Sequence, residues 1–190
     1  MKLILDNLIF IFWAAWLVYW ALASRKVKSA VRRESPLSRA GHAVPLLIAA
    51  LLLALPSLPI GWLAKPLYPM TAYVYWASLA VTAAGLAFSV WARVHLAGNW
   101  SGIVTLKQDH ELVRSGPYRL VRNPIYTGLL LAFIGTAMAR DQWRGWLAVA
   151  IAFAALWRKL RLEERWLEER FGIAYRLYRQ HVAALIPYLL

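Results

Sequence analysis

The sequence predicts an all-α, multi-span integral membrane protein with five hydrophobic segments. Of its 190 residues, 61% are hydrophobic, and the mean hydropathy is +0.50, whereas ordinary soluble domains contain about 45–50% apolar residues. The formal charge of +13 gathers in short clusters between apolar runs. Such clusters are typical of cytoplasmic loops and of contact with membrane lipids, so we expect no nucleic-acid partner. Cysteine is absent, which excludes disulfides and thiolate chemistry.

Three apolar runs in residues 1–97 are each long enough to cross the bilayer. They are Leu3–Ala23, Ala43–Ala64 and Met70–Leu96, and a helix needs roughly 20 residues to cross ~30 Å of hydrocarbon. The basic segment after the first run predicts a cytoplasmic loop, an N-terminus outside and an uncleaved first span. Prolines should bend or break the outer half of the second run; they are Pro45, Pro56 and Pro59.

Residues 98–190 show a different pattern, although the length favours a single membrane domain over residues 1–190. A polar segment from Ala97 to Asn123 should be cytoplasmic. Two shorter apolar runs follow, Ile125–Ala139 and Gly145–Trp157, and each reaches only about 20–23 Å as a helix. We expect them to form a shallow helical hairpin whose charged turn lies near the outer face or dips into the bilayer. A separate charged cytoplasmic helix should then begin at Arg158.

The stretch GPYRLVRNPIYTG, Gly116 to Gly128, is stiff and polar directly ahead of an apolar run. Pro117 and Pro124 disfavour helix at the preceding residues, so Gly116 and Asn123 should be extended. Their backbone groups then need another partner, and Asn123 should cap the helix that follows. The stretch fits either a capped helix start with interfacial tyrosines and arginines or the wall of a ligand pocket.

Two carboxylates flank the apolar stripe of the last charged helix. At ~100° per residue, Glu163 and Glu164 project on either side of the stripe that holds Leu160 and Leu167. They belong either to a solvated ladder of i,i+4 ion pairs or to a site for a cationic ligand. No metal-ligand spacing relates the four histidines, so we expect no metal site; they are His42, His95, His110 and His181.

Two segments together resemble the isoprenylcysteine carboxyl methyltransferase family and its phospholipid methyltransferase relatives. They are HELVRSGPYRLVRNPIYTG and EERWLEERFGIAYRLYRQHVAALIP, and the resemblance covers about Asn99 to Pro187. In that family, GxYxxxRHPxYxG and EExxLxxxFGxxYxxYxxxV…P segments enclose S-adenosylmethionine at the cytoplasmic membrane face. The resemblance implies that residues 98–190 form the cofactor-binding, catalytic half of an O-methyltransferase. It also implies that a prenylated cysteine or similar lipophilic acceptor enters from the bilayer.

The resemblance also assigns site residues position by position. In the family an arginine holds the acceptor carboxylate, and that position corresponds to Lys159 here. Arg158 and Arg161 lie close to it in the sequence, and Glu163 completes the predicted catalytic set. Asn123 stands where the family usually has histidine, so it can hydrogen-bond but cannot titrate. The implied cofactor contacts are Thr105, His110, Glu111, Leu112, Val113, Tyr118, Asn123, Pro124, Ile125, Tyr126 and Glu163.

The chemistry of the cofactor agrees with these residue types. A sulfonium cation favours a carboxylate and aromatic faces, which Glu163, Tyr118 and Tyr126 would supply. A carboxylate acceptor is already ionised at neutral pH and needs no general base, whereas an amine acceptor would need one. The open alternatives are methylation of a phospholipid amine or a small lipophilic thiol, a membrane reductase with a nicotinamide cofactor, and a transporter or scaffold without enzymatic activity.

Overall fold

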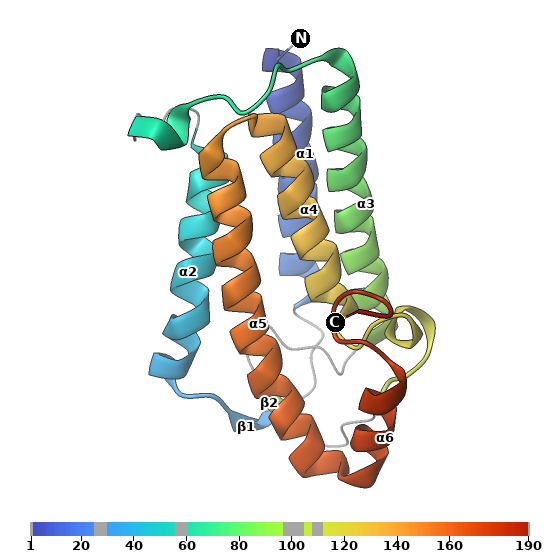
Figure 1. The fold of residues 1–190 in the computed structure, drawn as a ribbon. Helices are drawn as coiled ribbons and strands as arrows, with labels where there is room; N and C mark the ends of the chain where they lie inside the picture. Colours follow the sequence, from blue (N-terminus) through green and yellow to red (C-terminus); the bar gives the residue numbers. More distant parts are fainter. Residues whose placement is uncertain (1, 25–29, 56–60, 97–104, 108–111, 190) are drawn as a thin grey trace.

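The computed structural model describes residues 2–24, 30–55, 61–96, 105–107 and 112–189. Five long helices run alternately up and down in one bundle, and a short sixth helix closes one end (Figure 1). The all-α class is confirmed. The helices are α1 Lys2–Ala23, α2 Pro36–Ala54, α3 Ala72–Leu96, α4 Pro124–Arg140, α5 Trp143–Phe171 and α6 Ile173–His181.

Two short strands, which the sequence pattern did not predict, add a small antiparallel sheet. Strand β1, Ala30–Arg33, pairs with β2, Thr105–Lys107, with Arg33 opposite Thr105. The sheet lies at the same end of the bundle as α6 (Figure 1). It ties the segment ahead of α2 to a segment of the second half of the chain.

Helices α2 and α3 are long and apolar enough to cross a membrane. The stretch Asn7–Ala23 of α1 and the whole of α4 are apolar but shorter. The number of membrane crossings, predicted as five apolar segments with three full spans, therefore stays a prediction.

The predicted bounds of the second span, Ala43–Ala64, are wrong at both ends. Helix α2 starts at Pro36 because the Ser35 side chain caps it, accepting a hydrogen bond from the Ser38 amide at 3.2 Å. It runs through Pro45 and ends at Ala54, because Leu55 is extended (φ −66°, ψ 127°) ahead of a proline. Pro56 and Pro59 lie outside the described residues.

Two arginines from the turn between α4 and α5 cap the end of α2. The Ala54 carbonyl accepts from Arg140 Nη2 at 3.3 Å, and the Leu55 carbonyl accepts from Arg144 Nη1 at 2.8 Å. Arg144 is only 2% exposed. Cations at a helix C-terminus satisfy its last carbonyls and its dipole, so these charges have a structural role.

The predicted division of the last helices at Trp157 and Arg158 is also wrong. Helix α5 is continuous over 29 residues from Trp143 to Phe171, a length of about 43 Å. Glycine and proline are absent between Gly145 and Gly172, and the charged part consists of strong helix formers. Helix α5 ends where Gly172 takes a φ of +55°. The turn between α4 and α5, by contrast, lies where the sequence predicted it.

Close approach of glycines brings α3 against α4, which form the most extensive helix pair of the bundle. A Cβ atom added at Gly128 would lie 2.5 Å from the Gly85 carbonyl oxygen and 2.7 Å from the Ser89 amide nitrogen. Small residues of this kind let helix backbones touch in membrane proteins. Helix α1 joins the pair through Trp16, whose indole donates to Ser89 Oγ at 2.8 Å.

We expect Gly128→Ala to destabilise the fold by about 1–3 kcal/mol, because the methyl group would press against backbone atoms that cannot move independently. Gly41→Ala is the matched control. The atoms nearest its Cβ would belong to the guanidinium of Arg158, the far end of a flexible side chain, which can shift more easily than backbone atoms. Thermal unfolding in detergent measures both variants, and equal midpoints for the two would contradict the close α3–α4 contact.

Candidate functional site

The segment ahead of α4 takes the non-helical course that its prolines demand. The 3-10 helix Gly116–Arg119 (η3) contains Pro117, and Asn123 ends the segment at φ −125° and ψ 60°. Gly116 is not extended, contrary to prediction, but left-handed at φ +59°. Glycine is favoured here for a second reason, because a Cβ would lie 2.7 Å from the His95 ring.

The carboxyl-terminal segment supplies the partners that this backbone requires. The amides of Arg122 and Asn123 donate to the Ala183 and Ala184 carbonyls at 2.8 and 3.1 Å. Thr127 Oγ1, one turn into α4, donates to the Leu185 carbonyl at 2.7 Å. The backbone that the sequence left open to a cavity or ligand is therefore satisfied within the chain.

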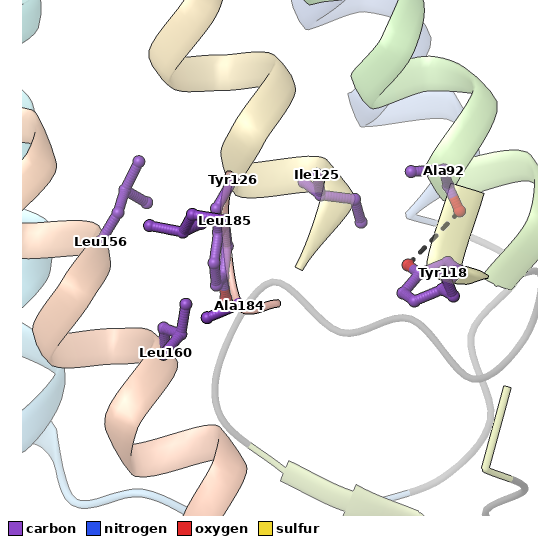
Figure 2. Close-up of a cluster of buried hydrophobic side chains, with 8 residues drawn as sticks. All are labelled: Ala92, Tyr118, Ile125, Tyr126, Leu156, Leu160, Ala184 and Leu185. Carbon is purple, nitrogen blue, oxygen red and sulfur yellow. Dashed lines mark hydrogen bonds between the residues drawn. The ribbon is translucent and has the colours of Figure 1, made fainter. Parts of the chain in front are cut away.

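An apolar cluster lies beneath this pairing. Figure 2 shows Ala184 and Leu185 beside the Tyr126 ring, facing Leu156 and Leu160 of α5. Both α5 leucines are at most 1% exposed. The start of α4, the middle of α5 and the carboxyl-terminal segment thus share one core, which positions the polar groups at its edge.

The Arg122–Glu164 ion pair links these three elements. Arg122 Nε donates to Glu164 Oε1 at 2.7 Å, and the two side chains are 9% and 5% exposed. Arg122 Nη1 also donates to the carbonyls of Arg179, at 3.2 Å, and Val182. The sequence analysis did not single out Arg122. The signal for it was an arginine directly before Asn123 and Pro124, in a chain that also carries the adjacent acids Glu163 and Glu164 on a partly apolar helix.

Asn123 joins the same carboxylate. Its Nδ2 donates to Glu164 Oε1 and to the Ala184 carbonyl, both at 3.4 Å. Asn123 occupies the N-cap position of α4, but among the described residues its side chain makes no capping hydrogen bond. The predicted cap is therefore wrong in detail, because the amide is directed toward α5 and the carboxyl-terminal segment.

Glu163, one residue before Glu164, points to the first turn of α4. Tyr126 Oη donates to Glu163 Oε1 at 2.7 Å, and Lys159 Nζ lies 3.9 Å from the same oxygen and 5.5 Å from the Tyr126 ring centroid. Burial raises the pKa of the Glu163 carboxyl, while Lys159 and the Tyr126 hydrogen bond oppose the rise. The Glu163 side chain as a whole is 24% exposed, so it is only partly enclosed.

Of the two alternatives for this acidic pair, the geometry fits a site better than a solvated ladder. Glu163 is paired along α5 with Lys159 at i,i+4 spacing, but both side chains are largely enclosed and Glu163 also contacts Tyr126 of α4. Glu164 is paired with Arg122 of the segment ahead of α4. Glu168 does behave as a surface ion-pair residue, with Arg176 at 3.8 Å and Arg179 at 3.5 Å.

The start of α4, the middle of α5 and the carboxyl-terminal segment meet at what is called the junction below. Most of the predicted cofactor contacts that the structure describes lie there. Tyr118, Ile125 and Tyr126 are members of the apolar cluster, Val113 packs against it, and Pro124 is fully buried. The Tyr118 hydroxyl donates to the Ala92 carbonyl at 3.5 Å (Figure 2).

The other predicted contacts are less closely placed. Leu112 is half-buried beside Val113, and Thr105 lies in strand β2. His110 and Glu111 lie outside the described residues.

The predicted catalytic cations are not brought together. Lys159 is buried beside Tyr126, but the neighbouring Arg158 turns to α2, where it donates to the Ser38 carbonyl at 2.8 Å and lies 3.3 Å from His42 Nδ1. Arg161 is exposed. Successive helix residues point about 100° apart, so Arg158 cannot share the surroundings of Lys159.

Chemically, the junction offers a carboxylate, an aromatic hydroxyl and a lysine within a few ångströms of one another, bordered by apolar side chains. Such a group can hold a cation at the carboxylate and an anion at the lysine. The two charged ligands could then sit side by side in a largely dry environment.

The model of the phospholipid methyltransferase family matches residues 72–174, more than half of the chain. The match runs from the start of α3 to the start of α6, so it includes the contact between α4 and α5 but not the carboxyl-terminal segment that packs against it. The chain belongs to the phospholipid methyltransferase family.

Two curated relatives and one solved structure are similar to it. Protein-S-isoprenylcysteine O-methyltransferase A of Arabidopsis thaliana is 33% identical over 91 residues, 45% of this chain and 44% of that protein. Protein-S-isoprenylcysteine O-methyltransferase of Saccharomyces cerevisiae is 34% identical over 103 residues, 50% of this chain and 42% of that protein. The chain thus matches less than half the length of either relative.

The structure of the eukaryotic intramembrane Ras methyltransferase ICMT (isoprenylcysteine carboxyl methyltransferase) has a TM-score of 0.52 to this chain at 25% identity. The superposition covers 84% of this chain and 55% of the other. The shared fold extends well beyond the sequence motifs and agrees with the apolar composition and the span-length helices found here.

We expect Arg122→Ala to destabilise the fold by about 3–5 kcal/mol, because Glu164 would remain buried without its ionic partner. Arg119→Ala removes an exposed arginine three residues away and serves as the control. Thermal unfolding of both variants tests this. A double variant Arg122→Ala/Glu164→Gln should lose less stability than the sum of its two single changes; strict additivity would show that the pair is not coupled.

Proposed function

We propose that this protein is an integral membrane, S-adenosylmethionine-dependent O-methyltransferase. Its acceptor is the carboxylate of a prenylated cysteine or of a similar lipophilic molecule. The observation that carries the proposal is the contact of Tyr126 with Glu163, and of Glu163 with Lys159, at the start of α4, in a chain of a methyltransferase family. S-adenosylhomocysteine would be the product.

The residues at the junction fit the cofactor. Glu163 would hold the positive end of the cofactor, with the ring and hydroxyl of Tyr126 beside it. Tyr118 and Ile125 would supply apolar surface beside the partly exposed Glu163 side chain. When bound, the cofactor supplies an electrophilic methyl group, and its sulfur keeps the electron pair of the broken bond.

Lys159 would hold the acceptor. Its ammonium group lies near Glu163 and over the Tyr126 ring. A cationic ligand at Glu163 would take the place of this ammonium group, which could then bind an incoming carboxylate. The four charges, Glu163, Lys159, a sulfonium and a carboxylate, then sum to zero, which suits a poorly solvated site. Alignment and desolvation are the work left to the protein, because an ionised carboxylate needs no base.

We also propose a topology with the N-terminus outside and the site and carboxyl terminus at the cytoplasmic face. The small sheet, α6 and the junction lie at one end of the bundle, and the turn between α4 and α5 lies at the other (Figure 1). Strand β1, which carries Arg32 and Arg33, lies at the first of these ends, and the positive-inside rule places such basic residues on the cytoplasmic side. The lipophilic acceptor would reach the junction from within the bilayer.

Cofactor binding tests the site. We expect Glu163→Gln to weaken S-adenosylmethionine binding roughly tenfold or more in calorimetry, and to weaken S-adenosylhomocysteine less, because only the first ligand carries a sulfonium charge. Tyr126→Phe should weaken both modestly through the lost hydrogen bond to Glu163.

Glu169→Gln is the matched control, since Glu169 is exposed on the same helix. A parent protein that binds neither ligand would favour a transporter or scaffold. Variants of Glu163 and Tyr126 that bind as the parent does would refute the site, even if the protein proves to be an enzyme.

Turnover with labelled cofactor distinguishes the acceptor classes. We expect methylation of a farnesylated cysteine carboxylate, with little transfer to a phospholipid amine or a small lipophilic thiol, because no general base is assigned at the junction. Lys159→Met should raise the KM for the carboxylate acceptor and leave cofactor affinity nearly unchanged. Preferred transfer to an amine would instead agree with the family description and would overturn the acceptor assignment.

A further inference from the structure

A depression of about 390 Å³ lies at the beginning of α2. Its lining residues come from the end of β1 and the first two turns of α2, and they are Arg33, Glu34, Pro36, Arg39, Ala40 and Ala43. Charged side chains and small apolar side chains line it together. This combination matches a ligand that carries a charged group on an apolar body.

The charge that the depression presents is positive. Arg33 and Arg39 are exposed, whereas the Glu34 side chain is only 1% exposed and turns inward, with its Oε1 atom 3.4 Å from His42 Nε2. Arg158 Nη1 lies on the other side of the same imidazole. The acid is therefore engaged below the surface, and two guanidinium groups, which suit phosphate oxygens well, face outward.

An apolar stripe leads away from the depression along α2. Ala40 and Ala43 begin a series at helical spacing that continues to Leu51, about 16 Å further along the axis. Its large members are 44–59% exposed, and only 17% of the apolar window of α2 is buried. They are Val44, Leu47, Ile48 and Leu51.

We propose that this depression binds the headgroup of an anionic phospholipid, whose acyl chains lie along the stripe from Ala43 to Leu51. Arg33 and Arg39 would hold the phosphate, and the apolar stripe would replace the neighbouring lipid tails. The proposal does not depend on the methyl acceptor or the cofactor.

The position of the depression suggests a consequence for the second half of the chain. Arg33 lies opposite Thr105 in the small sheet, so a lipid held by Arg33 would steady the strand pair. An anionic leaflet is the expected source of such a lipid at a basic membrane face.

The test is a titration of the purified full chain in detergent with dioleoyl phosphatidylglycerol or dioleoyl phosphatidylcholine, followed by native mass spectrometry. We expect the parent to retain phosphatidylglycerol roughly tenfold more tightly than phosphatidylcholine. Arg33→Gln/Arg39→Gln should lose most of this preference. Arg165→Gln/Arg170→Gln removes the same charge from exposed positions on α5 and should keep it.

A second pair of variants separates shape from charge. Ala43→Trp fills the depression without changing any charge and should also lose phosphatidylglycerol, whereas Ala150→Trp, at an exposed position of α5, should bind as the parent does. Equal losses in the two arginine double variants, or full retention in Ala43→Trp, would overturn the proposal. Equal competition by free glycerol phosphate would also overturn it, by showing that the anion alone suffices. The proposal would likewise be overturned if Arg33→Gln/Arg39→Gln changed the KM for the methyl acceptor but left phosphatidylglycerol retention unchanged.

Discussion

The buried ion pair between Arg122 and Glu164 is the constraint on which the rest of the junction depends. Pro124 leaves the backbone before α4 without helical partners, and the carboxyl-terminal segment provides them. That segment has little regular structure, so it needs an anchor. Arg122 supplies it by donating to the Val182 and Arg179 carbonyls while its charge is balanced by Glu164. A buried cation without that carboxylate would be strongly unfavourable.

The same ion pair fixes the rotation of α5 about its axis. With Glu164 held against Arg122, the adjacent Glu163 must point about 100° around the helix, and there it meets the Tyr126 hydroxyl. Lys159, one turn earlier, falls on the same side, while Arg158 is directed to α2. One continuous helix thus contributes to two polar groups, the junction with α4 and the group formed by Glu34, His42 and Arg158, whose charges act on one another.

The sequence predicted the parts of this arrangement that depend on local chemistry. Apolar runs predicted the helices, Pro124 predicted the start of α4, and the resemblance singled out Tyr126 and Glu163. It could not predict the continuity of α5, because the change from apolar to charged residues at Trp157 reflects the surroundings of the helix and not its backbone. Nor could it predict that residues 183–185 would pair with 122–127, since such pairing depends on tertiary contact and leaves no periodic pattern in a short segment.

Asn123 bears on the choice of acceptor. The family usually has histidine at this position, and the amide here is committed to Glu164 and the Ala184 carbonyl. An asparagine can orient the acid but cannot take a proton. On the proposed function, this change costs a carboxylate acceptor nothing, because its oxygen is already nucleophilic at neutral pH. An amine acceptor would lose its nearest titratable group, and the remaining candidate, Glu163, would have to bind the cofactor and remove the proton at once. The residue at this one position therefore favours acceptors that arrive deprotonated.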